Sequence, residues 1–187
     1  MNPNHPLPSN DALTKLAISY GITSWNEIVE FVKKLPYGRT TNRTDFGLVI
    51  SEKKGSCSSK HAFLKRIADL NTIPNVKLIL CIYQMNPLNT PKIGAVLSTN
   101  ALEFIPEAHC YLKINGNRID ITTQDSEFKT IEQDIIHELE IEADQVVSFK
   151  VDYHQKFIKN WINDTQSELS FDQMWRIREQ CIKNLSN

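Results

Sequence analysis

The sequence predicts an α+β fold in which a cysteine-bearing helix packs on an antiparallel sheet, with further helices at the termini. Three observations lead to this prediction. Apolar residues recur at helical spacing near both ends of the chain and in its middle. Residues 76–85 form a β-rich, largely apolar run. Asn115-Gly116 separates two alternating apolar runs, which is typical of a two-residue β-hairpin.

The first two predicted elements are helices. One spans residues 9–20, with Ser9 or Asn10 as its N-terminal cap, and it ends before a glycine. The next helix begins at Ser24, because Ser24 followed by Glu27 is the pattern of a capping box. It is expected to end where a proline and a glycine follow.

The middle of the chain is predicted to alternate between loop, helix and strand. Residues 37–56 are expected to form a loop with one short strand near Phe46–Ile50. A helix follows from about Ser56 to Leu70, and Val76–Met85 is expected to be a buried strand. The stretch 86–106 contains several prolines and asparagines and is predicted to be a long loop.

The predicted hairpin brings two polar residues together. Its strands are Ala108–Ile114 and Arg118–Thr122, joined by Asn115-Gly116. In that register His109 and Asp120 are diagonal neighbours on one face, roughly 7–8 Å apart at the backbone. A shift of one residue would place them on opposite faces. The spacing therefore allows an imidazole N–H to bond the carboxylate.

The last third of the chain begins with an acidic stretch, residues 126–144, which is expected to be a solvated surface. Val146–Val151 is predicted to be a further strand of the sheet. Two helices are predicted after it, at 153–162 and 171–185, and the second carries an apolar stripe. The sheet is therefore expected to be covered by helices from both ends of the chain.

Length and composition are those of an ordinary globular protein. The 187 residues are predicted to form one domain, 1–187, with a core at about 22–152 and terminal helices at 9–20 and 153–185. Apolar residues make up 41% of the chain and charged residues 23%. The net charge of −1 gives no general attraction to nucleic acid or to anionic membranes, so neither is expected as a partner.

The expected location is the cytoplasm. Residues 1–10 are polar and lack the apolar core of a signal peptide. No segment has the apolar length of a membrane span. The four cysteines are scattered without a CxxC pair, which is typical of free thiols in a reducing compartment.

Cys57 differs from the other cysteines in its surroundings. It follows Gly-Ser and opens a predicted helix, whose N-terminal partial positive charge lowers the pKa of a thiol and favours the thiolate. Cys81 lies in an apolar predicted strand and Cys181 on the last predicted helix, and both are expected in the core. Cys110 follows His109 on a strand, so it is expected to point to the opposite face, also into the core.

At these residues the chain resembles the transglutaminase-like superfamily, a branch of papain-like thiol enzymes. The similar features are a Gly-x-Cys opening a helix at Cys57, Ile73-Pro74 before a strand, and a histidine and an aspartate on paired strands, over roughly residues 35–125. The resemblance implies a triad in which Cys57 is the nucleophile, His109 the base and Asp120 the residue that orients the histidine. It also implies that an upstream group helps the cysteine N–H to stabilise an oxyanion.

The expected function is therefore thiol-dependent acyl chemistry on a peptide, protein or small amide or ester, by hydrolysis or acyl transfer and without a cofactor. The resembled family also contains inert relatives, so the alternative is a catalytically inactive module that binds a protein or peptide. A metal site made of Cys57, His61 and His109 is a further alternative, but zinc would need Asp120 or a water as its fourth ligand. His61 is otherwise expected on the helix surface or lining the site. Asn42 is one candidate for the upstream oxyanion group.

Overall fold

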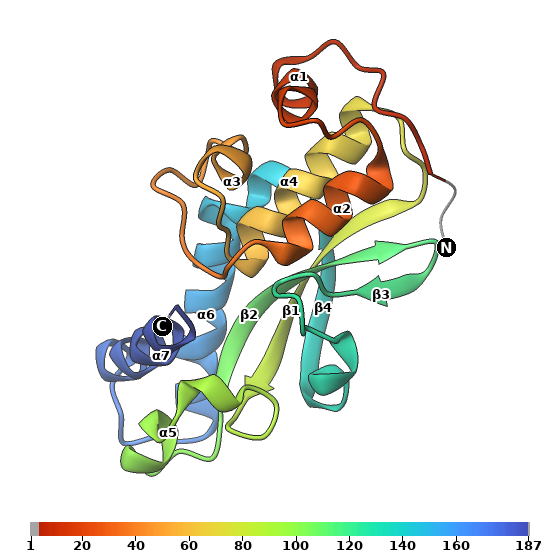
Figure 1. Ribbon diagram of the computed structural model, residues 1–187. Helices are drawn as coiled ribbons and strands as arrows, with labels where there is room; N and C mark the ends of the chain where they lie inside the picture. Colours follow the sequence, from red (N-terminus) through yellow and green to blue (C-terminus); the bar gives the residue numbers. More distant parts are fainter. Residues whose placement is uncertain (1–3, 187) are drawn as a thin grey trace.

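Four strands form one antiparallel sheet with the order β3-β2-β1-β4 (Figure 1). The computed structural model describes residues 4–186, and the outermost residues of the predicted domain, 1–3 and 187, lie outside the described residues. The strands are β1 (Val76–Met85), β2 (Ile105–Ile114), β3 (Asn117–Ile119) and β4 (Ile135–Ile141). The α-helices are α1 (Ala12–Ser19), α2 (Trp25–Lys34), α3 (Leu48–Ser51), α4 (Cys57–Leu70), α5 (Val96–Thr99), α6 (Ser148–Asp164) and α7 (Phe171–Leu185). The predicted α+β class with an antiparallel sheet is confirmed.

The first helix is capped by Asp11, so the prediction of Ser9 or Asn10 as the cap is wrong. The Asp11 carboxylate accepts hydrogen bonds from the backbone N–H groups at the start of α1, at 2.8 and 2.9 Å. The capping box of α2 is present as predicted, because the Glu27 carboxylate accepts from the Ser24 N–H at 3.0 Å.

Two predicted loop regions contain helical turns. The expected strand near Phe46–Ile50 is wrong, since Leu48–Ser51 forms the short helix α3. Its apolar residues Val49 and Ile50 are fully buried, and a short apolar run does not distinguish a strand from a buried helical turn. The predicted loop at 86–106 also contains α5 and a turn of 3-10 helix, η1 (Pro91–Ile93).

The hairpin between β2 and β3 has the predicted register. Ile114 lies opposite Asn117 and Leu112 opposite Ile119. Asn115 and Gly116 have φ values of 48° and 84°, which is the backbone that a two-residue hairpin turn needs and that asparagine and glycine tolerate best. The predicted strand Arg118–Thr122 is wrong in its bounds, because β3 ends at Ile119 and Asp120 follows directly after it.

The fourth strand lies inside the acidic stretch. β4 pairs with β1 at Ile135–Ile141, so the predicted strand at Val146–Val151 is wrong. Those residues instead form a 3-10 turn, η4 (Ala143–Val146), and the first turn of α6. β4 is an edge strand in which the exposed residues are Ile136, His137 and Glu140, so apolar and polar residues do not alternate regularly along it.

The sheet is buried on both faces, and α4 packs against β1 and β2 (Figure 1). Alternate residues of β1 belong to two apolar clusters. One cluster contains Leu78, Leu80 and Ile82 together with the inner faces of α2 and α4. The other contains Ile79, Cys81 and residues of α6 and α7. This packing places the N-terminus of α4 beside the middle of β2. No helix among residues 4–186 has the length and apolar character that crossing a membrane requires.

Candidate active site

Cys57 is the first residue of α4, and the preceding residues hold the helix start in place. Ser56 is the N-cap, and its N–H donates to Oγ of Ser59 at 2.9 Å. Gly55 is needed because the Lys60 side chain passes over it: a Cβ at that position would lie 2.6 Å from Cγ of Lys60. The glycine before the cysteine therefore provides space for a neighbouring side chain.

Lys60 connects three segments around the site. Its side chain is fully buried, and Nζ donates to the Leu35 carbonyl at 2.5 Å and the Thr122 carbonyl at 2.7 Å. Burial lowers its pKa to about 8, although the nearby Asp120 acts in the opposite direction. Lys60 thus joins the end of α2 and the start of α4 to the segment that carries the aspartate.

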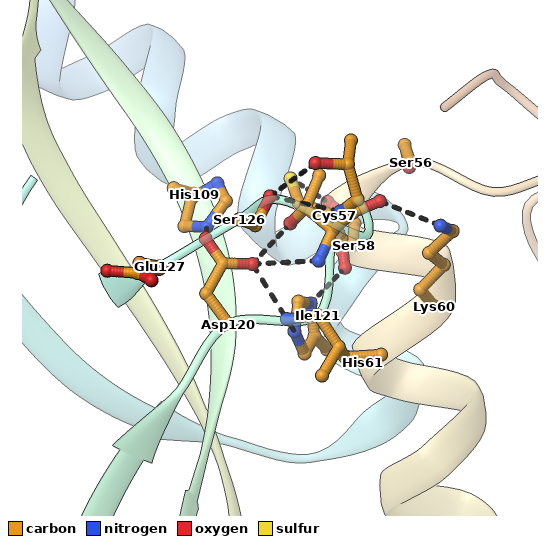
Figure 2. A network of polar contacts seen from close by, with 12 residues as sticks. Ser56, Cys57, Ser58, Lys60, His61, His109, Asp120, Ile121, Ser126 and Glu127 are labelled. Atoms are coloured by element: carbon orange, nitrogen blue, oxygen red, sulfur yellow. Dashed lines mark hydrogen bonds and ion pairs between the residues drawn. The ribbon is translucent and has the colours of Figure 1, made fainter. Parts of the chain in front are cut away.

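His109 and Asp120 lie beside the first turn of α4, where Cys57 is located (Figure 2). The Nε2 atom of His109 lies 2.9 Å from Oδ2 of Asp120, so the predicted contact across the hairpin is present. His109 also interacts electrostatically with the Cys57 sulfur. The second carboxylate oxygen of Asp120 accepts from the N–H and the hydroxyl of Thr122, at 2.9 and 2.6 Å. These bonds fix the carboxylate and direct it at the imidazole.

The charges of the site favour a thiolate and an imidazolium. Burial alone would raise the pKa of Cys57, but the cations Lys150 and His109 outweigh it and lower the pKa to about 6. Burial alone would lower the pKa of His109, but the negative charges of Asp120 and Cys57 raise it to about 10. Burial opposes ionisation of Asp120 as well, yet His109 holds that pKa far below its usual range.

Lys150 was not predicted to belong to the site. It lies in the first turn of α6, and its Nζ donates to Oγ of Ser58 at 2.6 Å. The predicted strand at 146–151 gave no reason to place its side chain beside Cys57. The positive charge of Lys150 stabilises the thiolate, and so does that of His109.

His61 lies beneath the site and is fully buried, so its expected place on the helix surface is wrong. Its Nε2 accepts from the Ile121 N–H at 3.0 Å, which leaves Nδ1 to donate to the Cys57 carbonyl at 2.7 Å. Burial lowers its pKa to about 4, so the ring is neutral at pH 7. Both ring nitrogens are engaged with the backbone, so His61 is not available as a metal ligand. Among residues 4–186, no group of three or more histidine, cysteine or acidic side chains is arranged to hold a metal ion.

The other three cysteines are all described by the structure and are buried in the core, as predicted. Burial raises the pKa of Cys110 to about 12 and that of Cys181 to about 11. Burial also raises the pKa of Cys81 well above its usual value. Cys57 is thus the one cysteine of the four whose surroundings favour the reactive form.

Two cavities reach Cys57, of about 370 and about 340 Å³. Tyr37 lines both, because the backbone at residues 36–38 pairs with Gly55 directly before the nucleophile. Burial raises the pKa of Tyr37, so its hydroxyl stays protonated. Asn42 lines neither cavity, and its side-chain oxygen accepts from the Thr44 N–H at 3.0 Å. Tyr37 is therefore the better placed upstream donor.

Comparisons with models of protein families, with curated proteins and with solved structures give no match for this chain. A fold class alone does not determine an activity, so the chemistry of the site itself is the basis for any function.

Proposed function

We propose that this protein carries out thiol-dependent acyl chemistry on an amide or ester, with Cys57 as the nucleophile. One observation supports the proposal above all others. A cysteine at a helix start interacts with a histidine that is hydrogen-bonded to a buried aspartate, and two cavities reach this cysteine. The proposal agrees with the resemblance to the transglutaminase-like superfamily, and membership of that superfamily remains a prediction.

The proposed first half-reaction forms a thioester. The Cys57 thiolate attacks the substrate carbonyl carbon, and the carbonyl π electrons move to its oxygen. When the tetrahedral intermediate collapses, the bond to the leaving group breaks. The leaving group takes a proton from His109. The Nε2 atom of His109 faces Asp120, so Nδ1 is the nitrogen that exchanges protons at the Cys57 side. Asp120 keeps the imidazole in this orientation throughout.

The second half-reaction releases the acyl group. A water molecule or an amine gives a proton to His109 and attacks the thioester carbonyl. The carbon–sulfur bond then breaks, and the thiolate and imidazolium are restored. Water as acceptor gives a hydrolase, and an amine gives a transferase.

The oxyanion of each tetrahedral intermediate needs hydrogen-bond donors. The Cys57 N–H lies at the start of α4, where backbone N–H groups have no partner within the helix. The Tyr37 hydroxyl, which lines both cavities with Cys57, is the proposed second donor. A Tyr37→Phe variant would then lower kcat with the thiol reactivity retained.

The proposal is tested by looking for a covalent acyl-enzyme. Wild-type protein and Cys57→Ala are incubated with activated esters, glutamine peptides and amine probes, and intact mass is measured. The expected result is an acyl adduct that maps to Cys57 and is absent from the variant, whereas a Cys181→Ala control retains it. The alternative of an inert binding module would replace this proposal if no substrate forms an adduct and Cys57→Ala still binds a peptide that wild type binds.

A further inference from the structure

The two cavities that meet at Cys57 differ in charge. The basic cavity, of about 370 Å³, is lined by four cationic side chains and two carboxylates: Arg39, Arg43, Lys150, Arg178, Glu107 and Glu179. The acidic cavity, of about 340 Å³, is lined by two cationic side chains and four carboxylates: Lys92, His109, Glu107, Asp120, Asp125 and Glu127. The chain as a whole has a net charge of −1, so this separation is local to the site.

Part of the positive charge in the basic cavity is not neutralised within the protein. Arg39 pairs with Glu179 at 2.9 Å, and Arg178 is bonded to the buried Glu107 at 2.7 Å. Among the residues that the structure describes, no carboxylate lies within 4.0 Å of Arg43 or Lys150. An anionic group in this cavity would complete the charge balance.

Arg43 is the one of these two cations that is suited to bind a ligand. Lys150 is already bonded to Ser58 and stabilises the thiolate. Arg43 lies at the exposed rim of the cavity, close enough to Arg39 and Arg178 to experience their repulsion. A guanidinium at a cavity rim favours a carboxylate or a phosphate group, to which it donates two parallel hydrogen bonds.

The position of His109 determines which part of a substrate enters which cavity. His109 lines the acidic cavity but not the basic cavity. The leaving group must take its proton from His109, so it has to lie on that side of the sulfur. In Figure 2 Glu127 also lies on the His109 side of the network. The acyl group bound to the sulfur then extends into the basic cavity.

We infer that the acyl group transferred to Cys57 carries an anionic substituent, a carboxylate or a phosphate, which binds at Arg43 in the basic cavity. This inference rests on the proposed function and adds the substrate class to it. The acidic cavity on the other side receives a neutral or cationic leaving group, such as an amine.

The inference is tested with two aryl esters of equal chain length. Para-nitrophenyl pentanoate is neutral, and mono-para-nitrophenyl glutarate carries a terminal carboxylate. In each reaction the thiolate displaces nitrophenolate and forms a thioester on Cys57. The expected ratio of kcat/KM, acidic over neutral ester, is roughly ten or more in wild type, the effect of one charge-assisted hydrogen bond. The ratio should fall as salt is added, because exposed charges are screened.

Arg43→Gln should lower this ratio roughly tenfold, and Arg66→Gln, which removes an exposed arginine of α4 outside both cavities, should leave it unchanged. A ratio near one in wild type, with a Cys57 adduct from the neutral ester, overturns the inference and leaves the proposed function standing. The same holds if Arg43→Gln does not change the ratio. If neither ester acylates Cys57, both the inference and the proposed function fail. If the acidic ester is preferred, a phosphonate-terminated ester distinguishes the two anions. A kcat/KM ratio over the neutral ester that is higher for the phosphonate than for the carboxylate assigns the pocket to phosphate.

Discussion

The Nζ atom of Lys150 donates a 2.6 Å hydrogen bond to Oγ of Ser58, the residue that follows Cys57. This contact joins the first turn of α6 to the first turn of α4, 92 residues earlier in the chain. It fixes an ammonium group beside a thiol whose burial would otherwise suppress ionisation. Two positive charges, those of Lys150 and His109, therefore stabilise the thiolate.

The first prediction concerns the pH dependence of Cys57 alkylation. The thiolate is the reactive form, so the rate with iodoacetamide should rise as the pH rises through about 6. Lys150→Gln removes the larger of the two stabilising charges, so the midpoint should move up by roughly one pKa unit, or about 1.4 kcal/mol. The rate is followed by peptide mass spectrometry and by the ultraviolet absorbance of the thiolate.

A matched control is Lys156→Gln, which removes an exposed lysine from the same helix and should leave the midpoint in place. An unchanged midpoint in Lys150→Gln would show that Lys150 does not act on the sulfur. Faster labelling of Cys81, Cys110 or Cys181 would contradict the assignment of Cys57 as the most reactive thiol.

The contact between His109 and Asp120 could be predicted because its determinants are local, whereas the placement of Cys57 beside them was expected from the resemblance to the transglutaminase-like superfamily. A Gly-Ser-Cys sequence begins the helix, and a two-residue turn sets the register that brings the other two together. Lys150 and Lys60 could not be predicted, because their side chains contact residues 92 and 62 positions away. No local sequence pattern predicts such contacts.

The strands were predictable only where both faces are apolar or where a turn marks the end. β1 is buried along most of its length and was predicted with its observed bounds. β4 is exposed along one edge, and its charged residues resemble a solvated surface. The apolar residues at 146–151 were predicted as a strand, but tertiary packing makes them a 3-10 turn and the start of α6.

The second prediction concerns Asp120→Asn. The asparagine oxygen can still accept from Thr122, so its amide NH₂ faces Nε2 of His109 and forces the proton onto the other ring nitrogen. The kcat should fall by roughly 10²–10⁴. The pKa of His109, measured by NMR, should fall because the negative charge is lost. Asp144→Asn, an exposed change in η4, is the control; equal activity of the two variants would exclude Asp120 from the mechanism.

The third prediction concerns the free energy of unfolding at mildly acidic pH. His61 has a pKa of about 4 in the folded protein, against an ordinary value of 6.5. As the pH falls from 6.5 toward 4, the unfolded chain binds a proton at His61 and the folded chain does not, so stability falls. This residue alone should account for about 2 kcal/mol between pH 7 and pH 5.

His61→Gln should remove that part of the pH dependence, although the variant is also less stable at pH 7, by about 1–3 kcal/mol, through loss of the bond to the Ile121 N–H. The free energy is measured by urea denaturation at both pH values. His137→Gln, at an exposed position of β4, should keep the wild-type dependence. If the free energy of unfolding of His61→Gln changed with pH as much as that of wild type, His61 would not be held neutral by burial.

The fourth prediction concerns the ion pair that attaches α7 to the sheet. Nε of Arg178 donates to the carboxylate of Glu107 on β2 at 2.7 Å, and both side chains are buried. Burial alone would raise the pKa of Glu107, but Arg178 lowers it to about 2. Arg178→Met leaves this carboxylate buried without its partner, so the free energy of unfolding should fall by about 3–5 kcal/mol.

The double variant Arg178→Met with Glu107→Leu tests whether the pair or the carboxylate alone is responsible. It should recover much of the lost stability, because two apolar side chains replace a desolvated ion pair. Arg176→Met, an exposed change on the same helix, should alter the free energy of unfolding by no more than about 0.5 kcal/mol. Glu107 lines both cavities beside Cys57, so the double variant should also change substrate turnover. If it were as unstable as Arg178→Met, packing of the arginine stem rather than the unpaired charge would explain the loss.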